Sequence, residues 1–113
     1  MSFKIQTLNK IAACGLNLLD RDNYEIASEI NNPDAILVRS ADMHQMALSE
    51  NVKAVARAGA GTNNIPIPEL TEKGVVVFNT PGANANAVKE LVILGLLLAS
   101  RPVLYANQWV NSL

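Results

Sequence analysis

Five short apolar runs, each bounded by polar or turn-forming residues, alternate along the chain with segments of helical spacing. Runs of this length that are rich in Val, Ile, Leu and Ala are typical of strands. The third run (AILV) is apolar at successive positions, as in parallel strands that are covered on both faces. We predict strands at residues 3–8, 24–27, 34–38, 52–58 and 75–78.

The segments between and after these runs predict helices. Asn9 is expected to cap the first of them. Pro66 and Pro68 lie near the start of a later helix, and Gly74 follows its end. Pro102 interrupts the last helical stretch and can begin a further helix at its first turn. The predicted helices cover residues 10–19, 43–48, 67–73 and 84–100.

This alternation predicts the α/β fold class. Strands separated by helices form a parallel sheet, and right-handed crossovers then give a flavodoxin-like, doubly wound sheet of five strands. A long interdomain helix would follow, so we expect a domain over residues 1–83 and a helical segment over 84–113. Doubly wound sheets bind ligands outside the carboxyl ends of their strands.

Polar and glycine residues gather at these predicted strand ends. Arg39 and Ser40 follow the third strand, residues 57–61 (RAGAG) follow the fourth, and Asn84 opens the long helix. A guanidinium offers a planar fork of donors to a carboxylate or phosphate. Glycines allow close approach to backbone N–H groups, and a helix N-terminus favours an anion. Together these residues predict an anion-binding edge.

Each of these residues also has a purely structural explanation. Arg39 could pair with Asp42, and Arg57 could lie over the sheet edge with its charge in water. Asn84 could serve only as a helix cap, and the two glycines of the RAGAG loop could serve turn geometry alone. The loop is not a dinucleotide fingerprint, because Asn64 stands where the third glycine would be needed.

Composition narrows the classes of function. A net charge of −1 with 17% charged residues leaves no basic excess for nucleic acid. The longest apolar stretch, 91–99, is much shorter than the roughly 20 residues of a membrane span, and a cytoplasmic protein is expected. Cys14 has no partner for a disulfide, His44 is expected on a surface helix, and no spacing of metal ligands occurs.

The strand-end residues resemble the D-isomer-specific 2-hydroxyacid dehydrogenase family. Residues 57–65 (RAGAGTNNI) are similar to the loop after the family's fourth strand. Residues 76–92 are similar to its fifth strand, the loop that follows and the interdomain helix. Residues 37–40 (LVRS) are similar to a strand end of the phosphoglycerate branch. The resemblance covers most of residues 35–101.

This resemblance implies a two-domain oxidoreductase that transfers hydride from a D-2-hydroxy acid to NAD. For the phosphoglycerate branch, the substrate is 3-phosphoglycerate and the product is 3-phosphohydroxypyruvate, which is the first step of serine biosynthesis. A sibling enzyme acting on glyoxylate, hydroxypyruvate or D-lactate is an alternative. A stand-alone flavodoxin-like interaction module is another.

The resemblance also implies roles for single residues. Arg39 and Ser40 would face the phosphate end of the substrate, and Arg57 would give a further cationic contact. The other implied contacts are the substrate carboxylate for Ala58 and Gly59, the nicotinamide for Ala60, and the border of the substrate site for Asn84. The helix at 84–100 is apolar nearly all round, which predicts a homodimer or larger assembly through residues 84–113.

The family's catalytic Arg, Glu and His and its NAD-binding Rossmann domain are expected outside residues 1–113, so no catalytic residue is assigned in this chain. We therefore predict that the chain alone has no dehydrogenase activity. Adding NAD and 3-phosphoglycerate should produce no rise in NADH absorbance, and clear turnover would contradict this assignment.

Overall fold

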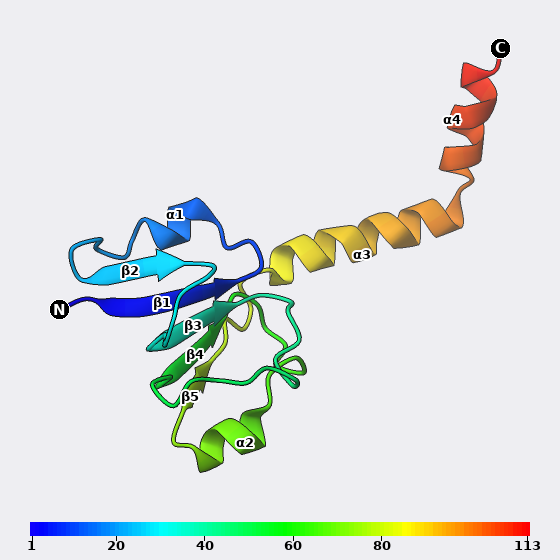
Figure 1. Ribbon diagram of the computed structural model, residues 1–113. Helices are drawn as coiled ribbons and strands as arrows, with labels where there is room; N and C mark the ends of the chain where they lie inside the picture. Colours follow the sequence, from blue (N-terminus) through cyan, green and yellow to red (C-terminus); the bar gives the residue numbers. More distant parts are fainter. The chain divides into compact units, whose positions relative to one another are not determined.

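The computed structural model describes all 113 residues, which divide into two compact units, Met1–Pro81 and Gly82–Leu113. The first unit holds all five strands, and the second holds two helices (Figure 1). No helix in either unit has both the length and the apolar composition needed to cross a membrane.

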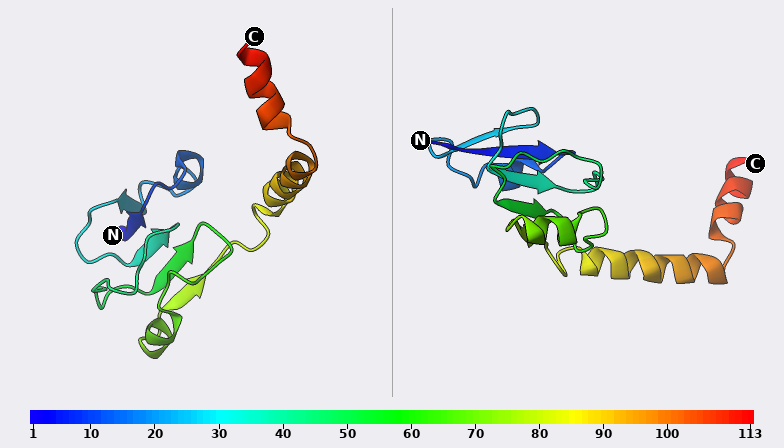
Figure 2. Two further views of the ribbon diagram at one scale, coloured as in Figure 1. Left: turned by 90° about the vertical axis from the view of Figure 1, so that its right-hand side faces the viewer. Right: turned by 60° about the horizontal axis from the view of Figure 1, so that its bottom comes forward.

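The first unit is built on one parallel sheet with the strand order β2-β1-β3-β4-β5. This order confirms the predicted flavodoxin-like, doubly wound sheet. Because every neighbouring pair is parallel, the carboxyl ends of the strands meet at the same edge (Figures 1 and 2). The strands are β1 (Phe3–Leu8), β2 (Tyr24–Ala27), β3 (Ala35–Val38), β4 (Ala54–Arg57) and β5 (Val76–Phe78).

The main cluster of hydrophobic core residues lies on one face of this sheet, and Ile5 of β1 is buried on the other face. Ile36 and Val38 of β3 and Val55 of β4 point to that face and are at most 1% exposed. On the other face, Leu37 is half-buried and Phe78 is 58% exposed. The third strand was expected to be covered on both faces. It is fully covered on the face of Ile36 and Val38 and only partly covered on the face of Leu37. The remaining core residues are Met43, Val52, Ile65, Leu70 and Val75.

The helix predicted over residues 10–19 is reduced to one turn, α1 (Ala13–Leu16), none of whose residues is buried. Asn9 does not cap it. The backbone of Asn9 has a positive φ of 67°, and its Oδ1 accepts hydrogen bonds from the N–H groups of Ser40 and Ala41. A side chain used to join β1 to the end of β3 is not available to the helix.

The helix predicted at 43–48 does not form. Met43 is a core residue, and its N–H donates to the carbonyl of Asn64 at 2.9 Å. Asp42 Oδ1 accepts from the N–H of His44 at 2.9 Å. Only one turn follows, in which the N–H of Met46 donates to the carbonyl of Met43 at 3.2 Å, so the segment is a loop and His44 is exposed on that loop.

Helix α2 (Ile67–Glu72) lies close to its predicted bounds. Pro66 precedes it, Leu70 reaches the core, and Gly74 follows with a φ of +72°. A positive φ is the left-handed conformation that glycine adopts without strain, which explains the sharp stop before β5.

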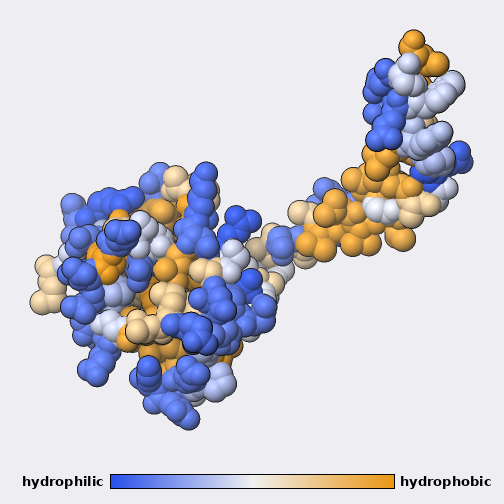
Figure 3. Space-filling model, turned by 45° about the vertical axis from the view of Figure 1, so that its right-hand side comes forward, coloured by the Kyte–Doolittle hydropathy of each residue, from blue (hydrophilic) through white to orange (hydrophobic).

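The second unit consists of α3 (Ala85–Ser100) and α4 (Val103–Asn111), separated at Arg101 and Pro102. Pro102 caps α4 rather than lying in its first turn. Apolar side chains line α3 on all sides, and the space-filling view shows them as an almost continuous surface along that helix (Figure 3). A helix of this kind needs an apolar partner.

Replacing the most central aliphatic side chain tests the one-sided core. Ile36→Ala should lower the free energy of unfolding by about 2 to 5 kcal/mol, because it removes buried methyl groups and leaves a cavity. Leu18→Ala is the matched control, since Leu18 is 87% exposed. Urea denaturation followed by circular dichroism measures both, and equal losses would contradict the assigned core.

Candidate functional site

Arg57 is the last residue of β4 and lies in register with Val38 of β3. Its Nε donates a hydrogen bond of 2.8 Å to the carbonyl of Arg39. Its Nη1 is buried and has no hydrogen-bond partner. A buried charged donor left unpaired is costly, so Arg57 is a residue whose hydrogen bonding is not completed within the chain.

The absence of a side chain at Gly61 leaves room for the Arg57 guanidinium. A Cβ at residue 61 would lie 2.7 Å from Arg57 Nη1, and a Cβ at residue 59 would lie 3.4 Å from Arg57 Nε. Neither Gly59 nor Gly61 has a positive φ. A positive φ therefore explains neither glycine, whereas close packing against the arginine explains Gly61.

The loop at residues 59–61 presents both backbone carbonyls and backbone N–H groups at the same edge. The carbonyl of Gly59 accepts from the N–H of Thr80 at 3.0 Å, and the carbonyl of Ala60 accepts from Asn79 Nδ2 at 2.9 Å. The N–H groups of Gly59, Ala60 and Gly61 have no acceptor within the chain. The loop is thus anchored through its carbonyls to the end of β5, and its N–H groups are left for a ligand.

Arg39 and Ser40 lie at the end of β3 beside Arg57. Both are exposed, and Asp42, the alternative partner considered for Arg39, accepts from the N–H of His44. The N–H of Ser40 donates to Asn9 Oδ1 at 3.0 Å, which fixes its backbone. The Ser40 hydroxyl and the Arg39 guanidinium are the groups that a ligand can reach.

Sequence analysis missed two residues of this edge, Asn9 and Asn64. Asn64 is 9% exposed, and its Nδ2 donates to the carbonyls of Arg39 at 3.2 Å and Ala41 at 2.8 Å. Asn64 entered the sequence argument only as the residue that breaks a glycine pattern. Burial of a single amide side chain produces no periodic pattern, so the sequence alone could not identify Asn64.

Asn84 is the N-cap residue of α3 in the second unit, and its side chain makes no capping hydrogen bond. The simple capping role is therefore not observed. The residues that the first unit itself brings to one edge are Arg39, Ser40, Arg57, Ala58, Gly59 and Ala60.

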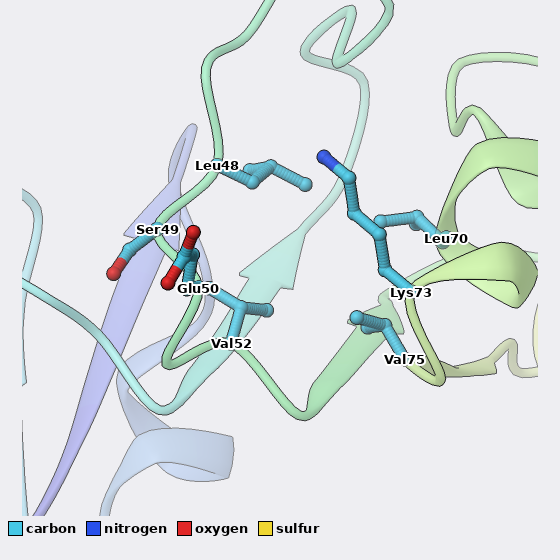
Figure 4. Close-up of a pocket in the computed structure, with 7 residues that line it drawn as sticks. All are labelled: Leu48, Ser49, Glu50, Val52, Leu70, Lys73 and Val75. Carbon is cyan, nitrogen blue, oxygen red and sulfur yellow. The ribbon is translucent and has the colours of Figure 1, made fainter.

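A separate hollow of about 380 Å³ lies at the opposite edge of the sheet, where β4 and β5 begin. Apolar side chains of Leu70 and Val75 form part of its wall, and Figure 4 shows Glu50 and Lys73 on opposite sides of it. The structure does not bring this hollow together with Arg57.

The edge at Arg57 can bind and orient an anion. Its guanidinium, the free N–H groups of the loop and the Ser40 hydroxyl supply hydrogen bonds and positive charge.

The single histidine and the single cysteine lie elsewhere in the first unit. His44 Nε2 lies 2.8 Å from the carbonyl of Asn63, and Cys14 is exposed in α1. No group of three or more His, Cys, Asp or Glu side chains could hold a metal ion.

Comparison with known proteins matches residues 5–108 to the family model of the D-isomer specific 2-hydroxyacid dehydrogenase catalytic domain. A hydroxypyruvate reductase of Thermotoga maritima is 39% identical over 73% of this chain and 31% of its own length. A D-3-phosphoglycerate dehydrogenase of Mycobacterium leprae is 36% identical over 76% of this chain and 17% of its own length. The chain thus spans about a third or less of these relatives.

The fold is similar to the crystal structure of an NAD⁺-bound 3-phosphoglycerate dehydrogenase from Entamoeba histolytica. The TM-score is 0.71 and the sequence identity is 27%, over 87% of this chain and 39% of that one.

Replacing one glycine tests the space around Arg57. Gly61→Ala should displace the guanidinium, because the new Cβ would lie 2.7 Å from Nη1, and should break the Nε hydrogen bond to Arg39. Gly15→Ala is the matched control, since nothing lies within 4 Å of its added Cβ. Crystal structures of both variants would decide, and an unmoved Arg57 in Gly61→Ala would contradict the packing argument.

Proposed function

This chain belongs to the D-isomer specific 2-hydroxyacid dehydrogenase family, and we propose that it forms the substrate-binding part of an NAD-dependent D-3-phosphoglycerate dehydrogenase. The observation that carries the proposal is the Arg57 guanidinium, which has a buried, unpaired Nη1 beside three free backbone N–H groups. That arrangement suits a carboxylate, which every 2-hydroxy acid carries. Relatives named D-3-phosphoglycerate dehydrogenase support the choice of substrate.

In this proposal, the two ends of the substrate are held by different residues. Arg57 and the backbone segment at Ala58 and Gly59 hold the carboxylate, with the N–H of Gly59 as the donor, since the N–H of Ala58 already donates to the carbonyl of Val38. Arg39 and Ser40, which are exposed beside it, hold the phosphate. Two anchored ends fix the position of C2, from which hydride leaves. Preorganised positive charge of this kind stabilises an anionic substrate most strongly in a cleft that excludes water.

NAD supplies the hydride acceptor in the proposed reaction. Of the residues present, only Ala60 is proposed to border the nicotinamide, and its exposed methyl group leaves room for a flat ring. The chain has no fingerprint for the pyrophosphate. We therefore assign most of the NAD contacts, and the catalytic Arg, Glu and His, to other parts of such an enzyme.

The proposal also gives each part of the chain a role. Residues 1–83 form the substrate domain, and residues 84–113, including Asn84 at the border of the substrate site, form an interdomain and dimerisation segment. The apolar surface of α3 supports an assembly, since Leu91, Leu96 and Leu97 are each more than 60% exposed. The enzyme would act in the cytoplasm as a homodimer.

A second candidate is reduction of hydroxypyruvate. The Thermotoga maritima relative of that name, at 39% identity, favours it. An unphosphorylated acid would use Arg57 and the loop in the same way but would leave Arg39 and Ser40 without a ligand group. Ligand binding at Arg39 and Ser40, after the end of β3, therefore distinguishes the two candidates.

Titration of the isotope-labelled chain, followed by NMR, tests the proposal. Adding 3-phosphoglycerate should shift the resonances of Arg39, Ser40, Arg57 and Gly59, whereas D-glycerate should shift only those of Arg57 and Gly59. Arg57→Ala should weaken binding about 10- to 100-fold, as expected for the loss of charge-assisted hydrogen bonds. Arg21→Ala, an exposed arginine in a turn, is the matched control. Equal shifts with both acids would favour the second candidate, and no shift at Arg57 would reject both.

Light scattering tests the proposed assembly. The chain should self-associate with rising concentration, and Leu97→Asp should shift it towards the monomer by placing a charge on α3. Leu18→Asp makes the same change at a residue that is 87% exposed in the first unit and should have no effect. A strictly monomeric chain at high concentration would contradict dimerisation through residues 84–113.

A further inference from the structure

The carbonyl of Arg39 is the common acceptor of two side chains. Arg57 Nε donates to it at 2.8 Å, and Asn64 Nδ2 donates to it at 3.2 Å. The carbonyl lies one residue beyond β3, where the last bond to the neighbouring segment is the one from Ala58 N–H to the carbonyl of Val38. No strand therefore fixes its direction, and the two side-chain donors do.

Asn64 is itself held firmly. Its Nδ2 makes a second bond of 2.8 Å to the carbonyl of Ala41, and its own carbonyl accepts from the N–H of Met43 at 2.9 Å. The residue is 9% exposed, so water competes weakly for these bonds. Asn64 thus holds residues 39–43 through three hydrogen bonds, to Arg39, Ala41 and Met43.

The chemistry of its neighbours fixes which way the amide points. Both groups that face Nδ2 are carbonyl oxygens, so a flipped amide would place Oδ1 against two acceptors. In the observed orientation, Oδ1 is buried without a donor. Asn64 therefore acts on this edge through the two carbonyls that Nδ2 binds, and not through Oδ1.

We propose that Asn64 is a positioning residue for Arg57. Its amide holds the Arg39 carbonyl in the direction in which it accepts the Arg57 Nε–H, which fixes the guanidinium at the ends of β3 and β4. The effect of Asn64 on substrate binding rests on the proposed function. Its effect on the orientation of Arg57 is independent of that function. Loss of the amide should free the guanidinium without unfolding the sheet.

The test compares Asn64→Leu with the unaltered chain by NMR, first with no ligand. The Arg57 Nε–H proton should be protected from exchange in the unaltered chain and should exchange about tenfold faster in Asn64→Leu, as expected for one lost hydrogen bond. Asn64→Gln, which keeps the amide, should restore part of the protection. Leu70→Val, a core change adjusted with urea to equal stability, is the control for general loosening.

Three results would overturn the proposal. The first is unchanged protection of the Arg57 proton in Asn64→Leu, and the second is an equal loss in the control. The third applies to the unaltered chain and holds even if Asn64→Leu does not fold. There the Arg57 proton would exchange freely while the Asn64 amide protons remain protected, which would show that the two groups are not coupled.

The same samples separate this inference from the proposed function. Asn64→Leu should also weaken binding of 3-phosphoglycerate about tenfold relative to the control. If the unaltered chain binds no 3-phosphoglycerate but the Arg57 proton still responds to Asn64→Leu, the proposed function fails and the positioning role stands. If binding occurs and the proton does not respond, the positioning role fails alone.

Discussion

The hydrogen bond from Arg57 Nε to the Arg39 carbonyl joins the ends of β3 and β4, and the rest of the edge is arranged around it. It turns the guanidinium back over the sheet instead of out into water. Gly61 must then lack a side chain, because a Cβ there would meet Nη1 at 2.7 Å. Asn79 and Thr80 anchor the glycine loop from the side of β5. These hydrogen bonds together join residues from three strand ends.

Much of this arrangement could be predicted from the sequence because it follows from the periodicity of apolar residues. Alternating strands and helices predict a parallel sheet, and a parallel sheet places all carboxyl ends at one edge. The positions of Arg39, Ser40 and Arg57 in the sequence were therefore enough to place them together. The order β2-β1-β3-β4-β5 agrees with that prediction.

The residues that could not be predicted are those whose role depends on a tertiary contact. Asn is a residue type that commonly caps helices, but Asn9 Oδ1 instead accepts hydrogen bonds from the N–H groups of Ser40 and Ala41, which are distant in the sequence. Asn64 is buried while its neighbour Asn63 is exposed, and nothing in the order of the two residues distinguishes them. The segment at 43–48 has helical spacing, yet the burial of Met43 and its bond to Asn64 hold it as a loop.

The one-sided core also bears on how the chain is made. Every member of the core cluster lies between Ile36 and Val75, so none belongs to α3 or α4. Domains generally fold as units during synthesis, beginning from the N-terminal end. The core cluster and all five strands, the last of which ends at Phe78, thus leave the ribosome before the apolar residues of α3 emerge. We expect the sheet to be folded by then, so that the aggregation-prone helix appears on a nascent chain whose anion-binding edge already exists.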